Sequence, residues 1–306
     1  MKSMLLFITF GAILFAMEPI TPIELPTSLN HEKVKLGEKL FFDTRLSRDN
    51  TVSCANCHNL EEGGDDNLKY SFGIEGQEGN INSPTILNAS NNFRQFWDGR
   101  AKDLQEQSEG PIENPVEMGF TFKELIPKLQ KTEYKNLFSK IYDEGITKNS
   151  ITDAIAEYEK TLVTPNAPFD KYLKGDKDAI TQTQKEGYEL FKAKGCISCH
   201  HGVNIGGNLY SKFGVVQGSS TSSFGRYNIT HRKRDMYSFK VPTLRNITMT
   251  APYFHDGRTS DLKEAISIMA QLQLGRHFTK EEIAKIEAFL HSLEGEIPKG
   301  KEIYVP

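Results

Sequence analysis

All four cysteines of the chain lie in two pentapeptides of one pattern, Cys54-Ala55-Asn56-Cys57-His58 and Cys196-Ile197-Ser198-Cys199-His200. The Cys-x-x-Cys-His pattern is typical of covalent haem c attachment, in which two thiols add to the haem vinyl groups and the histidine ligates the iron. A redox dithiol would not need the histidine twice. A zinc site shared by the two motifs would have to join segments 142 residues apart. We therefore predict two haem c groups, with His58 and His200 as the proximal iron ligands.

The ligand on the opposite face of each iron decides whether a haem relays electrons or acts on oxygen species, and a methionine there suits a relay. For the second haem, attached at Cys196 and Cys199, the candidates include Met236, Met249 and Met269. Met269 lies on an apolar helical stripe, where core packing is the simpler interpretation. The residues alone therefore favour core packing for Met269 and leave this ligand open.

The first haem has no such candidate nearby, because no histidine or methionine occurs between His58 and Trp97. We expect the distal face of its iron to be open. Gln107 and Glu117 lie further along the chain, and a carboxylate held over an open haem can move a proton between peroxide oxygens. A loop glutamate is more often simply solvated, and Met118 is a minor alternative as a ligand.

The bulk composition is that of a globular protein, with 306 residues, 38% hydrophobic and 25% charged, and a formal net charge of −3. No basic excess indicates a nucleic-acid partner. At the N-terminus, Lys2 precedes an apolar run from Met4 to Met17 that is typical of a secretory signal peptide and short for a membrane span. We expect residues 1–17 to be a signal peptide and the mature protein to be soluble and periplasmic. An uncleaved anchor stays open as an alternative, because Leu14 is large for a position before a cleavage site.

An internal duplication indicates the architecture. Segment 84–104 (PTILNASNNFRQFWDGRAKDL) matches segment 242–262 (PTLRNITMTAPYFHDGRTSDL) without a gap, at an offset of 158 residues. At this offset Trp97, the only tryptophan, corresponds to His255. Arg100 and Arg258, which follow the duplicated Asp-Gly turns, are candidate partners for haem propionates. Residues before the two haem motifs also match: Gly37, Leu40 and Phe41 with Gly187, Leu190 and Phe191.

We predict a mostly α fold of two tandem cytochrome c-like domains, residues 18–165 and 166–306, each with one covalently attached haem c and long loops. The join falls near Pro165 and Pro168, which break a helix. Apolar residues at three- and four-residue spacing predict helices over 33–42, 121–138, 151–162 and 181–191. The last helix should begin at Thr279, which forms a capping box with Glu282, and end at Gly295.

Long motifs in the same order over residues 35–293 resemble those of bacterial di-haem cytochrome c peroxidases. They are the two haem motifs and the segments 82–85, 93–100, 110–118, 240–246 and 250–255. The resemblance implies a periplasmic enzyme that reduces hydrogen peroxide to water with electrons from a small cytochrome c. It also implies a homodimer.

The resemblance assigns ligands and catalytic residues by position. His58 would ligate the peroxidatic haem, and His200 with Met269 would ligate the electron-accepting haem, which reverses the expectation from the residues alone. Gln107 and Glu117 fall on distal-pocket positions, where Glu117 would assist cleavage of the O–O bond.

The resemblance also assigns residues between the two domains. Trp97 falls on the position between the haems, where it would support electron transfer. Asn82, Thr250 and Pro252 fall on a calcium site, and their amide and carbonyl oxygens suit a hard cation.

One departure from the family pattern concerns the loop after the first haem motif. Many members carry a distal histidine there, which is released when the other haem is reduced, whereas this chain has Ile74. Because isoleucine cannot ligate iron, we expect the first haem to be five-coordinate or water-bound even when fully oxidised. Two other functions stay open, a non-catalytic di-haem electron-transfer cytochrome and a di-haem enzyme that oxidises a partner protein. The latter enzymes carry tyrosine where Met269 stands here.

Overall fold

The computed structural model describes residues 18–218, 221 and 223–298. The predicted signal peptide, residues 1–17, lies outside the described residues. Within the described ranges, no helix combines the length and the apolar composition that crossing a membrane requires.

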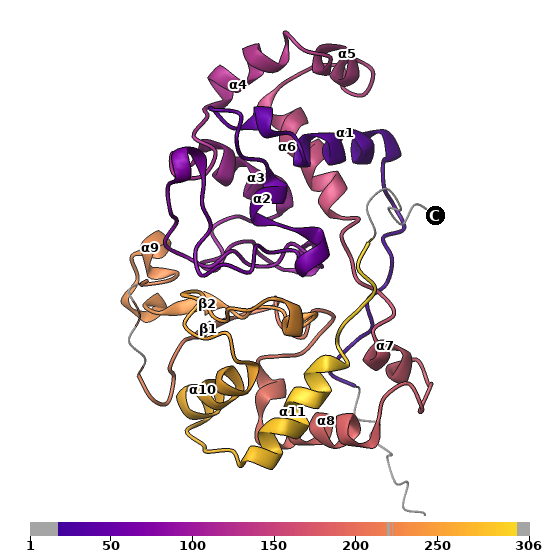
Figure 1. The fold of residues 1–306 in the computed structure, drawn as a ribbon, viewed down its shortest axis with the longest axis vertical. Helices are drawn as coiled ribbons and strands as arrows, with labels where there is room; N and C mark the ends of the chain where they lie inside the picture. Colours follow the sequence, from indigo (N-terminus) through magenta and orange to yellow (C-terminus); the bar gives the residue numbers. More distant parts are fainter. Residues whose placement is uncertain (1–17, 219–220, 222, 299–306) are drawn as a thin grey trace, which may run out of the picture.

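The described chain forms two stacked halves that are mostly helical, as the sequence predicts (Figure 1). The first half contains α1 (His31–Phe41), α2 (Cys54–Cys57), α3 (Leu104–Glu113), α4 (Phe122–Leu129), α5 (Tyr134–Ser139) and α6 (Lys148–Glu159). The second half contains α7 (Pro168–Leu173), α8 (Gln182–Lys194), β1 (Tyr210–Lys212), α9 (Tyr227–Thr230), β2 (Ser238–Lys240), α10 (Leu262–Leu274) and α11 (Lys280–His291). The two strands pair antiparallel, with Tyr210 opposite Lys240. They lie with long loops across the middle of the molecule, between the helices of the two halves (Figure 1).

Each half is built on two helices in close contact, α1 with α6 and α8 with α11. A Cβ on Gly37 of α1 would overlap the carbonyl of Ala154 on α6, and a Cβ on Gly187 of α8 would overlap the carbonyl of Lys285 on α11. The aromatic contacts beside these glycines are also repeated, with ring centroids 5.3 Å apart for Phe41 and Tyr158 and 5.2 Å apart for Phe191 and Phe289. These contacts confirm the internal duplication and make α6 equivalent to α11 at an offset of 131 residues.

The halves meet at a buried polar join, formed by Asn88, Thr164 and Asn246. The side-chain amides of Asn88 and Asn246 both donate to Thr164 Oγ1, at 2.8 and 2.9 Å. The Asn88 side-chain oxygen accepts the N–H of Thr164, and the Asn246 side-chain oxygen accepts that of Gly295. All three side chains of the join are fully buried, so water does not compete for these hydrogen bonds.

The two ends of the described chain cross between the halves. Ile20 precedes the first half in sequence but packs in the core of the second half, and the carbonyl of Thr21 accepts a hydrogen bond from Arg245. Ile297 follows the second half but packs against the apolar cluster of α1 and α6 in the first half. Each half therefore contains a segment from the far end of the chain.

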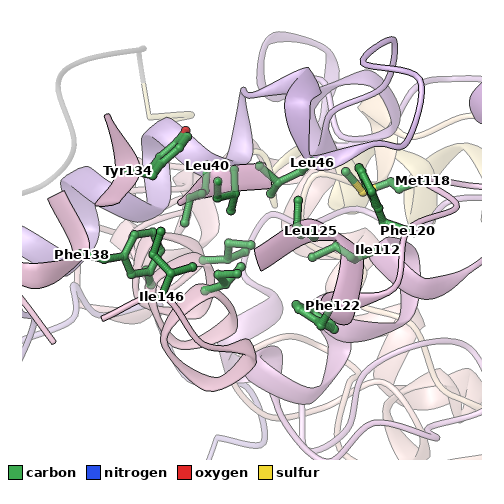
Figure 2. Packing of buried hydrophobic residues seen from close by; sticks show 14 of the residues in the cluster. Leu40, Leu46, Ile112, Met118, Phe120, Phe122, Leu125, Tyr134, Phe138 and Ile146 are labelled. Atoms are coloured by element: carbon green, nitrogen blue, oxygen red, sulfur yellow. The ribbon is translucent and has the colours of Figure 1, made fainter. Parts of the chain in front are cut away.

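The core of the first half collects apolar side chains from α1, α3, α4, α5 and α6 (Figure 2). The prediction of one helix over residues 121–138 is wrong, because the chain leaves the helix at 130–133 between α4 and α5. The Thr132 hydroxyl donates to the carbonyl of Leu129 and accepts the N–H of Tyr134, so a side chain satisfies backbone groups at the break. The break lets Tyr134 and Phe138 enter the core (Figure 2).

The other predicted helices are confirmed, with ends displaced by a few residues. They correspond to α1, α6 and α8. Thr279 forms the predicted capping box with Glu282 at the start of α11. This helix ends at His291, however, before the predicted stop at Gly295.

Candidate functional site

The structure holds the two predicted proximal histidines in the same way. His58 follows α2 directly, and its Nδ1 lies 3.1 Å from the carbonyl oxygen of Gly64. His200 Nδ1 lies 3.2 Å from the carbonyl oxygen of Ile205. With Nδ1–H donating to a carbonyl, each ring presents Nε2 to a metal. Burial lowers the pKa of both histidines, to about 4 for His200, which favours the neutral form that ligates iron.

The cysteine thiols have surroundings that do not suit a redox dithiol. The four cysteines form no disulfide. Burial raises the pKa of Cys57 and Cys196 to about 11, and it raises the pKa of Cys54 as well. A reactive dithiol needs a thiol of lowered pKa. Among the described residues, no cluster of three or more His, Cys, Asp or Glu side chains could hold a metal ion.

A cavity of about 380 Å³ in the second half has the lining of a haem pocket. Cys196, Cys199 and His200 line it, together with Met269 from α10. Most of the remaining second-half wall is apolar and includes Phe191, Leu262, Ile266, Phe278, Ile286 and Leu290. Neither Met236 nor Met249 is among the described residues that line this cavity. The structure therefore brings His200 and Met269 to one cavity, which fits a haem with one histidine and one methionine ligand.

Glu117 lies close to the first haem motif, in the segment that follows α3. Its Oε1 accepts a hydrogen bond from Asn114 Nδ2 at 2.6 Å. Its charge raises the pKa of the Cys57 thiol, so the carboxyl lies near the attachment point of the first haem. Burial raises the pKa of Glu117, although Asn114 and the charge of Arg100 act in the opposite direction. A carboxyl group in this environment is suited to proton transfer.

The other two residues predicted on this side have different surroundings. Gln107 lies near the start of α3 and is half-buried. Met118 is buried in the apolar core of the first half, in the same cluster as Phe120 (Figure 2). Met118 therefore packs as a core residue.

Ile74, which the resemblance places where many family members carry a distal histidine, is fully buried in the same cluster. Its N–H donates to the carbonyl of Glu117 at 2.8 Å. A Cβ on the preceding Gly73 would overlap the carbonyl of Val116, so the loop packs closely on the segment that carries Glu117. The Ile74 side chain thus fills apolar space in the first half.

Trp97 lies where the two halves meet. Its Nε1 donates to the carbonyl of Asn82 at 2.9 Å, and its own carbonyl accepts the N–H of Lys240 at 2.7 Å. The duplicate residue His255 makes the equivalent bond, because its backbone carbonyl accepts the N–H of Asn82 at 2.9 Å. Both side chains line the cavity of the second haem, with their ring centroids 6.1 Å apart. Trp97 therefore connects the first half to the wall of this cavity.

The three predicted calcium ligands, Asn82, Thr250 and Pro252, all line this cavity. Asp65, which sequence reasoning missed, lines it too. Its side chain is buried, and its Oδ1 has no hydrogen-bond partner among the described residues. Burial raises the pKa of Asp65 to about 8. A buried carboxylate oxygen without a partner, in a cavity that is also lined by residues with amide and carbonyl oxygens, fits a hard cation.

The charged residues near the haem sites include some that the sequence did not single out. Arg100 and Arg258, the predicted propionate partners, each pair with the aspartate of their own Asp-Gly-Arg turn. Glu159 and Lys240, which the sequence did not single out, are charged residues that are buried. No sequence pattern distinguishes these two from exposed charges, although the duplication places Lys240 at the position of Asn82.

Comparison with known proteins agrees with this geometry. Residues 31–178 match the family model of di-haem cytochrome c peroxidase, and residues 184–294 match that of cytochrome c. The chain is 47% identical to the cytochrome c551 peroxidase of Nitrosomonas europaea, over 97% of this chain and 90% of that protein. It is 44% identical to the cytochrome c551 peroxidase of Pseudomonas aeruginosa, over 91% of this chain and 83% of that protein. The chain belongs to the di-haem cytochrome c peroxidase family.

Relatives with another name are similar to this family member as well. The methylamine utilization protein MauG of Methylophilus methylotrophus is 32% identical, over 90% of this chain and 86% of that protein. The crystal structure of a MauG-like protein associated with microbial copper homeostasis has a TM-score of 0.79 at 25% identity, covering 95% of this chain and 96% of that one. Membership of the family confirms the two haem c groups and the mostly helical, two-domain fold.

Proposed function

We propose that this protein is a periplasmic cytochrome c peroxidase, which reduces hydrogen peroxide to two waters with two electrons from a small cytochrome c. The observation that carries the proposal is the inequality of the two haem sites. Met269 lines the cavity of His200, whereas Glu117 lies beside the first haem motif. One site suits an electron relay and the other suits proton transfer on a small substrate.

The first haem, when bound at His58, supplies the iron at which peroxide is reduced. Glu117 accepts a proton from one peroxide oxygen and returns it to the other, which leaves as water. Asn114 orients the Glu117 carboxyl through its 2.6 Å hydrogen bond. Gln107 completes the distal pocket. Each turnover consumes one peroxide, two protons and two electrons and releases two waters.

The second haem, when bound by His200 and Met269, supplies one-electron relay chemistry. Trp97 supports transfer between the haems, because it hydrogen-bonds to both halves through Asn82 and Lys240. We assign residues 18–165 to the peroxidatic domain and residues 166–306 to the electron-transfer domain.

Ile74 removes the histidine gate of the family from the first haem. Its side chain is fully buried, and its N–H is bonded to the Glu117 segment. This packing supports a loop that offers no ligand to iron, so the first haem accepts peroxide without prior release of a distal histidine.

Calcium and a second copy of the chain complete the proposal. Asn82, Thr250 and Pro252 would hold the ion between the halves, and the buried Asp65 would balance its charge. The enzyme would act as a homodimer, and the molar mass of the holoprotein measured by light scattering tests this.

The experiment that tests the proposed function is steady-state turnover of peroxide with a reduced small cytochrome c. We expect Glu117→Gln to lower kcat by about 100-fold or more, the usual range for loss of a general acid–base group. Glu113→Gln, which removes an exposed carboxylate at the end of α3, is the matched control and should keep full activity. A rate no better than that of free haem, or equal activity in Glu117→Gln and the wild type, would refute the proposal.

Oxidation of a partner protein is the second candidate, favoured by the 32% identity to MauG. The presence of Met269 in the cavity of the second haem favours the peroxidase instead, because partner-oxidising relatives carry tyrosine at this position. Turnover that persists with cytochrome c as the only protein substrate would exclude a requirement for such a partner.

A further inference from the structure

Two buried charges break the equivalence of the duplicated halves. Because α6 and α11 are equivalent at an offset of 131 residues, Glu159 occupies the position of Leu290. At the offset of 158, which relates the segments after the haem motifs, Lys240 occupies the position of Asn82. Each half thus carries one buried charge where the other half has a neutral side chain.

Glu159 lies beside the attachment point of the first haem. Its equivalent Leu290 lines the cavity of the second haem, which places the Glu159 carboxyl in the corresponding wall of the first site. The charge of Glu159 raises the pKa of the Cys54 thiol, so the carboxyl is near one of the sulfurs that bind the first haem. Glu159 is 3% exposed, and its Oε2 has no hydrogen-bond partner among the described residues. Such a group is costly to bury, so its presence points to a role.

Lys240 is the corresponding cation at the second haem. It lies at the end of β2, is 6% exposed, and lines the cavity that holds His200 and Met269. Burial lowers its pKa to about 8, and no neighbouring carboxylate acts against this effect. Arg100 and Arg258 are already engaged with the aspartates of their own turns. Lys240 therefore brings a positive charge to this cavity, and no carboxylate of the described residues shifts its pKa.

We propose that Glu159 and Lys240 set the order in which the two haems are reduced. Reduction adds one negative charge to a haem, and a buried neighbouring charge changes that equilibrium strongly because the local dielectric constant is low. Where Glu159 is ionised, its carboxylate disfavours reduction of the first haem, and the Lys240 ammonium favours reduction of the second. The Lys240 ammonium favours reduction of the second haem whether it faces the porphyrin or a haem carboxylate.

This inference rests on the proposed electron relay and names two charges that determine its direction. With the second haem reduced first, the first haem stays ferric and ready for peroxide. The charges act in addition to the axial ligands, which differ between the two irons.

Glu159 also couples reduction of the first haem to a proton. Burial raises its pKa to about 8, and no charged side chain of α1 or α3, the helices packed on α6, shifts it further. The titratable groups near it are Cys54 on α2, whose sulfur becomes a thioether, and Tyr158 on its own helix. When the adjacent iron gains an electron from the reductant, the carboxylate binds a proton from water. The equilibrium constant for reduction of the first haem should therefore fall with rising pH, by up to tenfold per pH unit.

A redox titration of the holoprotein, followed by absorption spectroscopy without peroxide, measures both midpoint potentials. We expect Glu159→Gln to make the first haem about tenfold easier to reduce above pH 8, which is about 59 mV for a one-electron couple, and to remove the pH dependence. Lys240→Met should make the second haem about tenfold harder to reduce at pH 7, and Lys240→Arg should leave it near the wild type. Glu32→Gln on α1 and Lys212→Met on β1 remove exposed charges, which solvent and salt screen, and should change neither potential.

Unchanged potentials in Glu159→Gln and Lys240→Met, or shifts of the opposite sign, would overturn the inference. If Glu159→Gln does not incorporate haem, the wild type decides, since a first-haem potential that does not fall between about pH 6 and pH 9 also overturns the role of Glu159. Because no peroxide is present, the outcome is separate from that of the proposed function. A protein that shows these shifts but does not reduce peroxide would retain the inference and refute the peroxidase.

Discussion

The buried join between the halves allows a stability prediction for Thr164→Val. The substitution keeps the shape of the side chain but removes the oxygen that accepts hydrogen bonds from Asn88 Nδ2 and Asn246 Nδ2. Both amides are fully buried, so neither reaches bulk water without movement of the halves. Leaving one buried donor unsatisfied costs about 1–3 kcal/mol. We therefore expect Thr164→Val to lower the free energy of unfolding by about 2–6 kcal/mol, the sum for two donors at that cost each.

The assay is urea unfolding of the holoprotein, followed by far-ultraviolet circular dichroism, with the change in free energy taken from the shift in midpoint. Thr161→Val is the matched control, because the buried Thr161 hydroxyl donates only to the carbonyl of Tyr158 in the preceding turn. Its loss should cost about 1 kcal/mol. Thr164→Ser keeps the hydroxyl and should stay close to the wild type. If Thr164→Val costs no more than Thr161→Val, the join does not hold the halves together as described.

Three further predictions concern the haem and ion sites. Burial raises the pKa of Glu117, and the ionised form of Glu117 accepts the proton from peroxide. The value of kcat/KM should therefore fall as the pH drops through a pKa above the ordinary carboxyl range. A pH profile that stays flat down to pH 4.5 would contradict this. Met269→Leu removes the proposed second ligand of the second haem, so the oxidised protein should gain a high-spin signal in electron paramagnetic resonance. An unchanged second-haem spectrum would refute the assignment. Asp65→Asn should weaken binding of calcium at the proposed site by tenfold or more, measured by calorimetry after chelator treatment. Glu62→Gln, which removes an exposed carboxylate, should not weaken it. Equal calcium affinities of Asp65→Asn and the wild type would exclude Asp65 from the site.

Much of the fold follows from local sequence patterns. The two Cys-x-x-Cys-His motifs predict covalent attachment of haem whatever the surrounding fold. The duplication is visible because Gly37 and Gly187 leave no room for a side chain between paired helices. The capping box of Thr279 and Glu282 is also local, and it marks the start of α11 correctly.

The features that the sequence could not provide depend on tertiary contacts. Apolar residues at helical spacing occur on both sides of residues 130–133, which are all polar, and the hydrogen bonds of Thr132 show that the helix breaks between them. The periodicity of α10 cannot tell a core methionine from an iron ligand, and Met269 is distinguished by the cavity that it shares with His200. Asp65 is notable because it is buried and one of its oxygens has no hydrogen-bond partner among the described residues. The sequence does not show which charged residues are buried.

The central claim is that the two haems are unequal and that the first has no distal protein ligand. Electron paramagnetic resonance of the fully oxidised protein tests it most directly, because the spin state reports the ligands of each iron. We expect one low-spin haem with histidine and methionine ligands and one high-spin haem, five-coordinate or water-bound, beside Ile74 and Glu117. Two low-spin haems with a bis-histidine component would contradict the account.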